Sequence, residues 1–261
     1  VVKAPVIVKT SETAWEYTVT NSRDIEETEA TVKVEWVDAN DELHNRPKSV
    51  TATLVANGTA TENTVTLNAA NGWTSTLTEL QKYSNGTGVV YTWLQGALPE
   101  GYKQTNSTEA EAVTTFTDSY YPAVTVTITG NNNETTYDGT EHTTNGYEVT
   151  DISYSLYTDA FFTFNGEASA SQTTVGTKNM GLDASQFTNT NPNYDNKVTF
   201  VIAADGYQTI TPAPVTVKAD DKSKVWGTAD DPTLTATVTG MVNDENASTL
   251  IAYTIDRATG R

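Results

Sequence analysis

Few residues of this chain have a type and spacing that supports catalysis. The chain has no cysteine and two histidines, His44 in NDELHNRP and His142 in DGTEHTT. Two histidines in separate turn-rich segments are a poor basis for a zinc site or a nucleophilic triad. The sequence also lacks a Gly-rich phosphate loop, paired catalytic carboxylates and a serine elbow. We therefore predict no catalytic residues, no metal site and no enzymatic activity.

Two acidic segments are candidates for a cation. The loop 38–42 (DANDE) alternates Asp and Asn, but it lacks the Gly at the sixth place and the Glu at the twelfth that a calcium loop of the EF-hand type needs. We predict a solvated connection between strands there. Asp220-Asp221 and Asp230-Asp231 are close enough in sequence to gather a cation, so calcium is the one cofactor left open.

The charge balance excludes some partners. The chain of 261 residues carries 33 acidic and 15 basic residues, a formal net charge of −18. A polyanion repels phosphate backbones and anionic lipid, so we expect no nucleic-acid partner. No apolar run approaches the ~20 residues of a membrane helix, so we expect no membrane insertion by these residues. We expect any export signal or anchor to lie outside them.

Alternation with a period of two runs through most of the chain. The clearest examples are TVKVEWV (31–37), VTATLVA (50–56), TVTLNAA (64–70), VTVTITG (124–130) and VTFVIAA (198–204). Val, Ile and Leu alternating with Thr are typical of half-buried antiparallel strands. Turn dipeptides such as Asn57-Gly58 and Asn85-Gly86 separate these runs. The sequence predicts an all-β protein, with tandem immunoglobulin-like β-sandwich modules in an elongated array.

Local breaks divide the chain into four parts. A strand ends at Tyr120-Tyr121-Pro122, and Thr211-Pro212-Ala213-Pro214 is a stiff joint because proline cannot donate to a strand ladder. A softer boundary lies near 22–29. The predicted parts are 1–29, 30–122, 123–212 and 213–261.

The second part has landmarks of a known family. They are VKVEWVDANDELHNRPKSVTATLVANG (32–58), TLNAANGWTSTLTELQKYSNGTGVVYTW (66–93), LPEGY (98–102) and TFTDSY (115–120). In order and spacing they resemble the Cna B-type repeat of Gram-positive surface adhesins. Residues 1–29 resemble the tail of a preceding repeat with a linker.

The remaining two parts resemble modules that often accompany such repeats. Residues 123–212 resemble a bacterial immunoglobulin-like module, through TYDGTEHT (136–143) and VGTKNMGLDASQFTNTNPNY (175–194). Residues 213–261 resemble a truncated MBG domain of the YGX type, where KVWGTADDPTLTATVTG (224–240) carries Trp226-Gly227-Thr228.

The resemblance to the Cna B-type repeat implies an intramolecular isopeptide bond, in which a lysine joins an Asn or Asp beside a catalytic acid. Carried over by position, the lysine falls on Val34, the acid on Gln95 and the acceptor on Asp118. Lys33 is one residue off, and alternation places it on the solvent face. We therefore predict that these three positions are not bonded. Asp118 is then either buried with Gln95 as its hydrogen-bond partner or exposed at a strand end.

Two further sets of residues carry weaker predictions. Asn21 aligns with the acceptor of the preceding repeat, and we interpret it as a possible vestige of an isopeptide site. Four aromatic residues offer a sugar-stacking face as an alternative to core packing: Trp73, Trp93, Tyr91 and Tyr102. Alternation favours the core for Trp36 and Trp73. The sequence does not identify ligand-binding residues.

The resemblance implies a stalk or spacer segment of a bacterial adhesin, extracellular and either anchored to the cell wall or secreted. Two alternatives remain open. One is a module that itself binds host extracellular matrix, mucin or glycan. The other is an accessory β-module of a secreted carbohydrate-active enzyme. A β-sandwich by itself specifies none of these functions.

Overall fold

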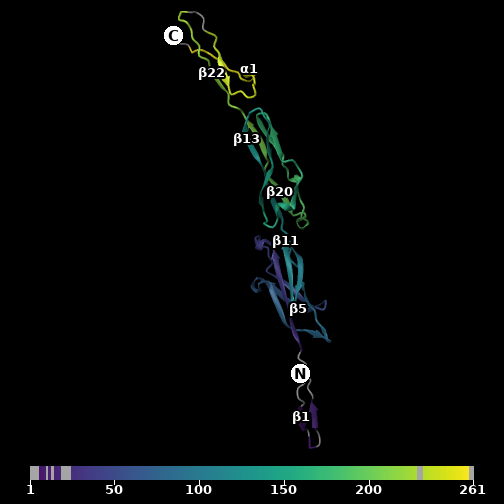
Figure 1. Cartoon of the computed structure of the whole chain (residues 1–261). Helices are drawn as coiled ribbons and strands as arrows, with labels where there is room; N and C mark the ends of the chain where they lie inside the picture. The colour runs from purple at the N-terminus through teal and green to yellow at the C-terminus, as the bar shows by residue number, and fades with distance from the viewer. Residues whose placement is uncertain (1–5, 10, 13–14, 19–24, 228–231, 259–261) are drawn as a thin grey trace. The chain divides into compact units, whose positions relative to one another are not determined.

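The computed structural model describes all residues except 1–5, 10, 13–14, 19–24, 228–231 and 259–261. The chain divides into two compact units, Val1–Pro122 (unit 1) and Ala123–Arg261 (unit 2), which are described separately. The all-β prediction is confirmed, since the described elements are mostly strands with a few short helical turns (Figure 1).

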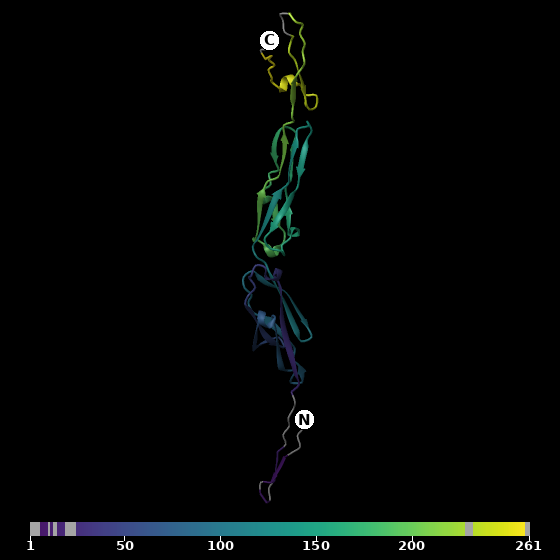
Figure 2. The same cartoon turned by 90° about the vertical axis from the view of Figure 1, so that its left-hand side faces the viewer.

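Unit 1 is a sandwich of two sheets with a small hairpin before it. One sheet has the order β10-β11-β3-β6 and the other β5-β4-β9. The strands are β1 (Val6–Lys9), β2 (Trp15–Thr18), β3 (Glu27–Val37), β4 (Ser49–Ala56), β5 (Thr59–Asn68), β6 (Thr74–Gln81), β7 (Tyr83–Ser84), β8 (Thr87–Gly88), β9 (Tyr91–Gln95), β10 (Tyr102–Ala110) and β11 (Val113–Tyr120). The two sheets are seen in Figure 2.

The core of unit 1 comes from the inward faces of both sheets. Val32, Val34 and Phe116 belong to the first sheet, and they pack with Leu54 and Trp93 of the second. Each of these side chains is at most 6% exposed. The alternation in the sequence therefore produces the two apolar faces that a sandwich buries.

Tight turns connect strands where the sequence predicts them. Asn57 and Gly58 join β4 to β5 with φ of 50° and 80°, and Asn85 and Gly86 join β7 to β8 with the same values. Positive φ at both central residues matches the twist of a two-residue hairpin and favours Asn-Gly there.

Unit 2 contains several small sheets, with the orders β15-β12-β20, β13-β21-β18, β14-β17, β16-β19 and β22-β23. The strands are β12 (Val124–Gly130), β13 (Asn132–Thr136), β14 (His142–Asn145), β15 (Tyr147–Ile152), β16 (Phe162–Phe164), β17 (Ser169–Gln172), β18 (Gly176–Asn179), β19 (Phe187–Asn189), β20 (Val198–Ala204), β21 (Tyr207–Thr211), β22 (Thr216–Ala219) and β23 (Ala236–Thr239). A short helix, α1 (Ala247–Leu250), follows β23.

Aromatic rings fill much of the interior of unit 2. Tyr154 and Tyr157 are at most 1% exposed, and Phe187 is 5% exposed. Tyr157 meets Tyr194 edge to face, with ring centroids 5.1 Å apart. Such contacts combine a large buried area with defined ring geometry.

In each unit an early strand lies parallel to a late one. In unit 1, β3 pairs with β11 through seven aligned residue pairs, from Thr31–Val113 to Val37–Ser119. In unit 2, β12 pairs in parallel with β20, and β13 with β21. Parallel neighbours need a long crossover connection, and in unit 1 the strands from β4 to β10 form the connection between β3 and β11.

Candidate functional site

The first strand of the unit 1 sandwich buries one face and exposes the other, as alternation predicts. On β3, Val32 and Val34 are 0% and 3% exposed. Lys33 points to solvent and its Nζ donates to Glu35 Oε1 across 2.6 Å, with both side chains about half exposed. The lysine nearest to the expected reactive position is thus on the opposite face from the core.

Asp118 lies inside the sandwich, so the interpretation that it is exposed at a strand end is wrong. It sits on β11, aligned with Trp36 on β3 and Gln104 on β10, and its exposed fraction is 0%. Gln95, on β9 of the facing sheet, donates from Nε2 to Asp118 Oδ2 across 2.6 Å. The hydrogen-bonded alternative is the one the structure has.

Burial dominates the electrostatics of this acid–amide pair. Loss of hydration raises the pKa of Asp118 to about 6, and the hydrogen bond from Gln95 opposes that shift only in part. The lysine side chains that the structure describes in unit 1 are all exposed: Lys33, Lys48, Lys82 and Lys103. None of them supplies a cation or an amine nucleophile to the pair.

One side-chain oxygen of each partner makes no hydrogen bond with another described residue. Asp118 Oδ1 and Gln95 Oε1 are buried acceptors that make no hydrogen bond in the part of the chain that is described. Two acceptors and no donor leave buried polar atoms unsatisfied, which is costly. A proton on Asp118 supplies the missing donor, which is consistent with the raised pKa.

A second buried acid corrects one sequence expectation. Asp38, in the loop predicted to be a solvated connection, is 2% exposed. Arg46 grips it through Nε to Oδ2 at 2.8 Å and Nη2 to Oδ1 at 2.6 Å. The hydroxyl of Tyr102 donates to Oδ2 at 3.1 Å, and the guanidinium lies 5.6 Å from the ring centre of Trp36.

Opposing effects set the ionisation of Asp38. Burial works against its charged form, but the hydrogen bonds and the charge of Arg46 outweigh burial and lower its pKa. The pKa of Tyr102 is raised, first by burial and then by the nearby carboxylate. Asp38 has the same strand parity as Val34 and Trp36. Alternation therefore indicates burial of Asp38, although the acidic composition of its loop favours exposure.

The two histidines and the pair Asp220-Asp221 lie in separate surroundings in the described part of the chain. His44 Nδ1 lies 2.9 Å from the carbonyl oxygen of Asp41, and His142 Nε2 lies 2.9 Å from Asp138 Oδ1. Within the described ranges no group of three or more His, Cys, Asp and Glu side chains is placed to hold a metal ion. Asp220 instead accepts hydrogen bonds from two threonine hydroxyls.

Some predicted positions cannot be placed. Asn21 and the pair at 230–231 lie outside the described residues. Of the aromatic residues considered as a sugar-stacking face, Trp73, Trp93 and Tyr102 are at most 9% exposed and belong to the interior of unit 1. Tyr91 is partly buried against the same core.

Taken together, these features define unit 1 as a β-sandwich module with a buried acid that is hydrogen-bonded to an amide of the facing sheet. Residues 30–119 match the family model of the Cna protein B-type domain, and residues 215–261 match that of the MBG domain (YGX type). The resemblances to these two families, predicted from the sequence, are confirmed for these residues.

A curated relative supports the first match. The chain is 38% identical over 85 residues to a protein named collagen adhesin from Staphylococcus aureus, which is 33% of this chain and 7% of that protein. The chain therefore spans a small part of this relative's length.

The chain is also similar to solved structures of adhesins. A single B repeat unit of the collagen binding surface protein of Staphylococcus aureus is 31% identical, with 41% of this chain and 67% of that chain covered and a TM-score of 0.35. The pilus adhesin SpaC of Lactobacillus rhamnosus GG is 12% identical, with coverage of 89% and 36% and a TM-score of 0.38. No helix in the described part of the chain is long and apolar enough to span a membrane.

Proposed function

We propose that this chain is a load-bearing spacer segment of a bacterial surface adhesin, outside the cell and without a catalytic role. The observation that carries the proposal is the parallel pairing of β3 with β11. Force applied at the start of β3 and the end of β11 pulls these two neighbours in opposite directions along their length. The ladder hydrogen bonds then share the load and must break together, which resists unfolding better than peeling them one by one.

Unit 2 has the same arrangement. Its first strand, β12, is parallel to β20, and β13 is parallel to β21, which is followed by the proline-containing joint at 212–214. Two modules in series, each loaded in shear, suit a stalk that holds a distal binding region away from a surface. The matches to adhesin domain families support this role.

We also propose that unit 1 carries no isopeptide bond. Its resistance to force then comes from packing and ladder bonds alone. Under sufficient load the whole B-type domain extends, releasing a contour of about 3.5 Å for each of its roughly 90 residues.

Single-molecule stretching of the whole chain between its ends tests both parts of the proposal. We expect one unfolding step whose contour gain corresponds to all of 30–119, at a force well above that of a peeled sandwich. A contour gain shortened by the 85-residue separation of Lys33 and Asp118 would reveal a covalent link between these two side chains. Low-force unfolding of both units would overturn the load-bearing role.

A second candidate function is binding to extracellular matrix. It is favoured by the name of the curated relative, collagen adhesin, although the matched residues form a small part of that protein. Binding of the whole chain to immobilised collagen, compared with immobilised mucin, tests this candidate. Retention on neither surface leaves the spacer role as the function.

A further inference from the structure

One sheet of unit 2 ends in a strand with an open edge. The order β15-β12-β20 places β15 at the edge, and β15 pairs with β12 on its inner side. Among the described residues it pairs with no other strand. Such an edge presents a row of backbone N–H and C=O groups that can pair with an additional strand.

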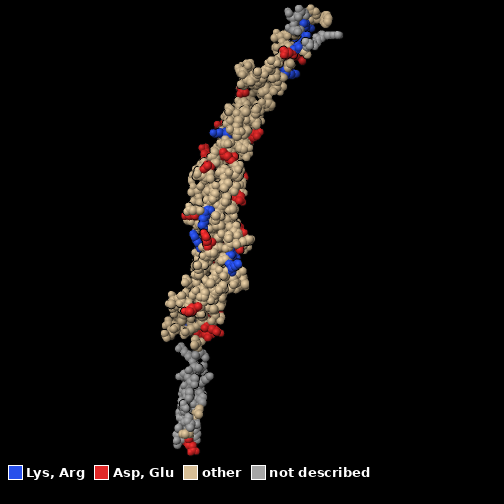
Figure 3. Space-filling view, turned by 180° about the vertical axis from the view of Figure 1, so that it is seen from behind, with Lys and Arg blue, Asp and Glu red and all other residues tan. Residues whose placement is uncertain are grey.

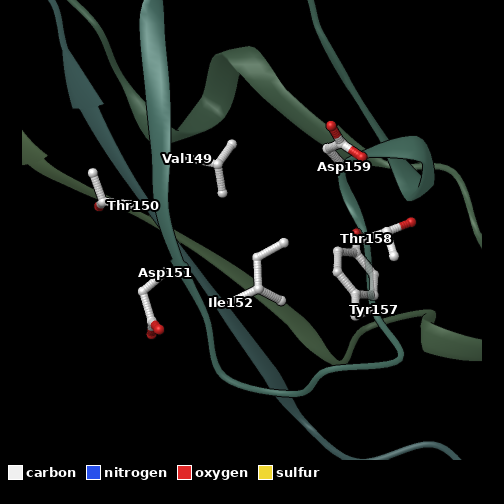
Figure 4. Close-up of a pocket in the computed structure, with 7 residues that line it drawn as sticks. All are labelled: Val149, Thr150, Asp151, Ile152, Tyr157, Thr158 and Asp159. Atoms are coloured by element: carbon white, nitrogen blue, oxygen red, sulfur yellow. The ribbon is translucent and has the colours of Figure 1, made fainter.

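A bulge sets which side chains face inward along β15. The register shifts by one between its pairing with Ile128 and its pairing with Thr127, so both Val149 and Ile152 oppose buried residues of β12. Figure 4 shows Val149 and Ile152 pointing toward Tyr157 and the segment after it, with Thr150 and Asp151 on the other side of the strand. The inward pair gives the open edge an apolar floor.

A groove follows this edge. One hollow, of about 490 Å³, lies between β15 and the segment from Tyr157 to Asp159 (Figure 4). A second, of about 650 Å³, is lined by Tyr147, Glu148 and Phe162 together with Val149 and Asp159, which it shares with the first. The two hollows therefore run on from one another along the length of the strand.

The groove is acidic and its acids are unpaired. Glu148, Asp151 and Asp159 line it, and no Lys or Arg is among the described residues lining either hollow. None of the three carboxylates makes an ion pair or a side-chain hydrogen bond with another described residue. On the face shown in Figure 3, acidic side chains are spread over both units, so acidic residues alone do not mark a site. The edge of β15 differs because its acidic residues lie beside an open strand edge.

We propose that the edge of β15 is a docking site for an extended segment of another protein, in which Lys or Arg alternates with apolar residues. The backbone of the segment adds a strand to the sheet and its apolar side chains meet Val149 and Ile152. Its cations lie on the other face beside Glu148 and Asp151, and Asp159 adds negative charge across the groove. A second copy of this chain is disfavoured as the occupant because each copy carries a formal net charge of −18.

The test uses the whole chain and a fluorescein-labelled, end-blocked peptide of three Val-Lys repeats, followed by anisotropy at physiological salt. We expect saturable binding. The same peptide with N-methyl groups on alternate residues keeps its charge but loses the donors of one edge, and we expect it to bind at least tenfold more weakly. Equal binding of the two peptides, or no binding of the first, would overturn strand addition.

Matched variants separate this site from general attraction to a polyanion. The triple substitution Glu148→Gln, Asp151→Asn, Asp159→Asn should weaken binding at least tenfold. The control triple Glu62→Gln, Glu109→Gln, Glu111→Gln changes the net charge equally at exposed positions of unit 1 and should leave binding within about twofold. Equal losses from the two triples would show nonspecific attraction and overturn the docking site.

Discussion

Gln95 Nε2 donates to Asp118 Oδ2 across 2.6 Å, joining the two sheets of unit 1 through one hydrogen bond. The pair occupies the positions where the family resemblance implies an acid and an acceptor, while Val34 occupies the lysine position as a core residue. Val34 has no amine, so the three positions do not include a nucleophile. A buried acid without a partner lowers the stability of the folded state, so the hydrogen bond from Gln95 offsets part of the cost of burying Asp118.

A glutamine in unit 2, Gln208, is fully buried and has hydrogen bonds to both its oxygen and its nitrogen. Gln208 in unit 2 is 0% exposed, and its Oε1 accepts from Thr144 Oγ1 at 2.6 Å. Its Nε2 donates to Thr135 Oγ1 and to the carbonyl of Thr209. Gln95 Oε1 and Asp118 Oδ1 instead make no hydrogen bond with another described residue, and only a proton on Asp118 would add a donor to the pair. The Gln95–Asp118 pair is therefore the one expected to respond to pH.

The stability of unit 1 should fall as pH rises toward neutral. Asp118 has a folded pKa of about 6 against an ordinary value of 3.8, so the folded state binds its proton more tightly than the unfolded state. Its contribution is complete below about pH 4 and is lost as pH rises through 6, amounting to about 3 kcal/mol. The pKa of Asp38 is lowered, so its ionised form stabilises the folded state and this stabilisation is lost as pH falls below about 4. We expect greatest stability near pH 4, because the Asp118 contribution is lost above that pH and the Asp38 contribution is lost below it.

Denaturant titrations followed by tryptophan fluorescence measure this dependence in the whole chain. The signal follows unit 1, because Trp36, Trp73 and Trp93 pack there while Trp226 is 98% exposed. The Asp118→Asn variant keeps the shape of the side chain and removes the proton, so its stability should change little between pH 5 and 7. An unchanged pH dependence in that variant would show that Asp118 is not the titrating group.

Restoring the missing lysine should restore a crosslink only when an acid accompanies it. In the double variant Val34→Lys, Gln95→Glu, the amine displaces the hydroxyl of the Asp118 carboxyl, forming one amide and releasing one water. The single variant Val34→Lys should keep its full mass, because Gln95 cannot carry a proton between the groups. Intact mass of the denatured chain distinguishes the two.

The control for that experiment adds Asp118→Ala to the double variant. It removes the acceptor and should show no loss of water. If the unsubstituted chain is already lighter than its sequence by one water or ammonia, the proposal of an uncrosslinked module is wrong.

Removing Arg46 should be among the most damaging single changes in unit 1. Arg46→Ala leaves the Asp38 carboxylate 2% exposed without its bidentate partner, and breaking one side of a buried pair costs about 3–5 kcal/mol. Tyr102→Phe removes one hydrogen bond, from a neutral hydroxyl to the Asp38 carboxylate at 3.1 Å, and should cost about 1.5–3 kcal/mol. Equal effects of the two variants on the denaturation midpoint would contradict the ranking.

Alternation predicts the side-chain faces of β3, because a strand with one buried face fixes its register. For Asp118 the sequence leaves burial beside Gln95 and exposure at a strand end both open, and the structure has the buried alternative. The burial of Asp38 was missed for a local reason. Its loop is rich in Asp and Asn, which is typical of solvated connections, and the neutralising Arg46 is eight residues away. Asp38 continues the parity of Val34 and Trp36 one residue past the end of β3, and this parity is the signal in the sequence for its burial.

The open edge of β15 could not be predicted from the sequence. Whether a strand is central or at an edge depends on which strands pair, and here β12 is flanked by β15 and by the distant β20. The bulge that turns both Val149 and Ile152 inward is also a property of the pairing. Local patterns set the faces of strands, whereas long-range pairing sets the edges.

Neighbouring substitutions on β3 provide the sharpest check of the faces. Val34→Ala removes buried apolar volume from a side chain that is 3% exposed and should cost about 2 kcal/mol of unfolding free energy. Lys33→Ala removes only an exposed ion pair with Glu35 and should change stability by less than about 1 kcal/mol. Both are measured by denaturant titration with tryptophan fluorescence. A larger loss for Lys33→Ala would mean that β3 is shifted by one residue, with Lys33 rather than Val34 on the buried face.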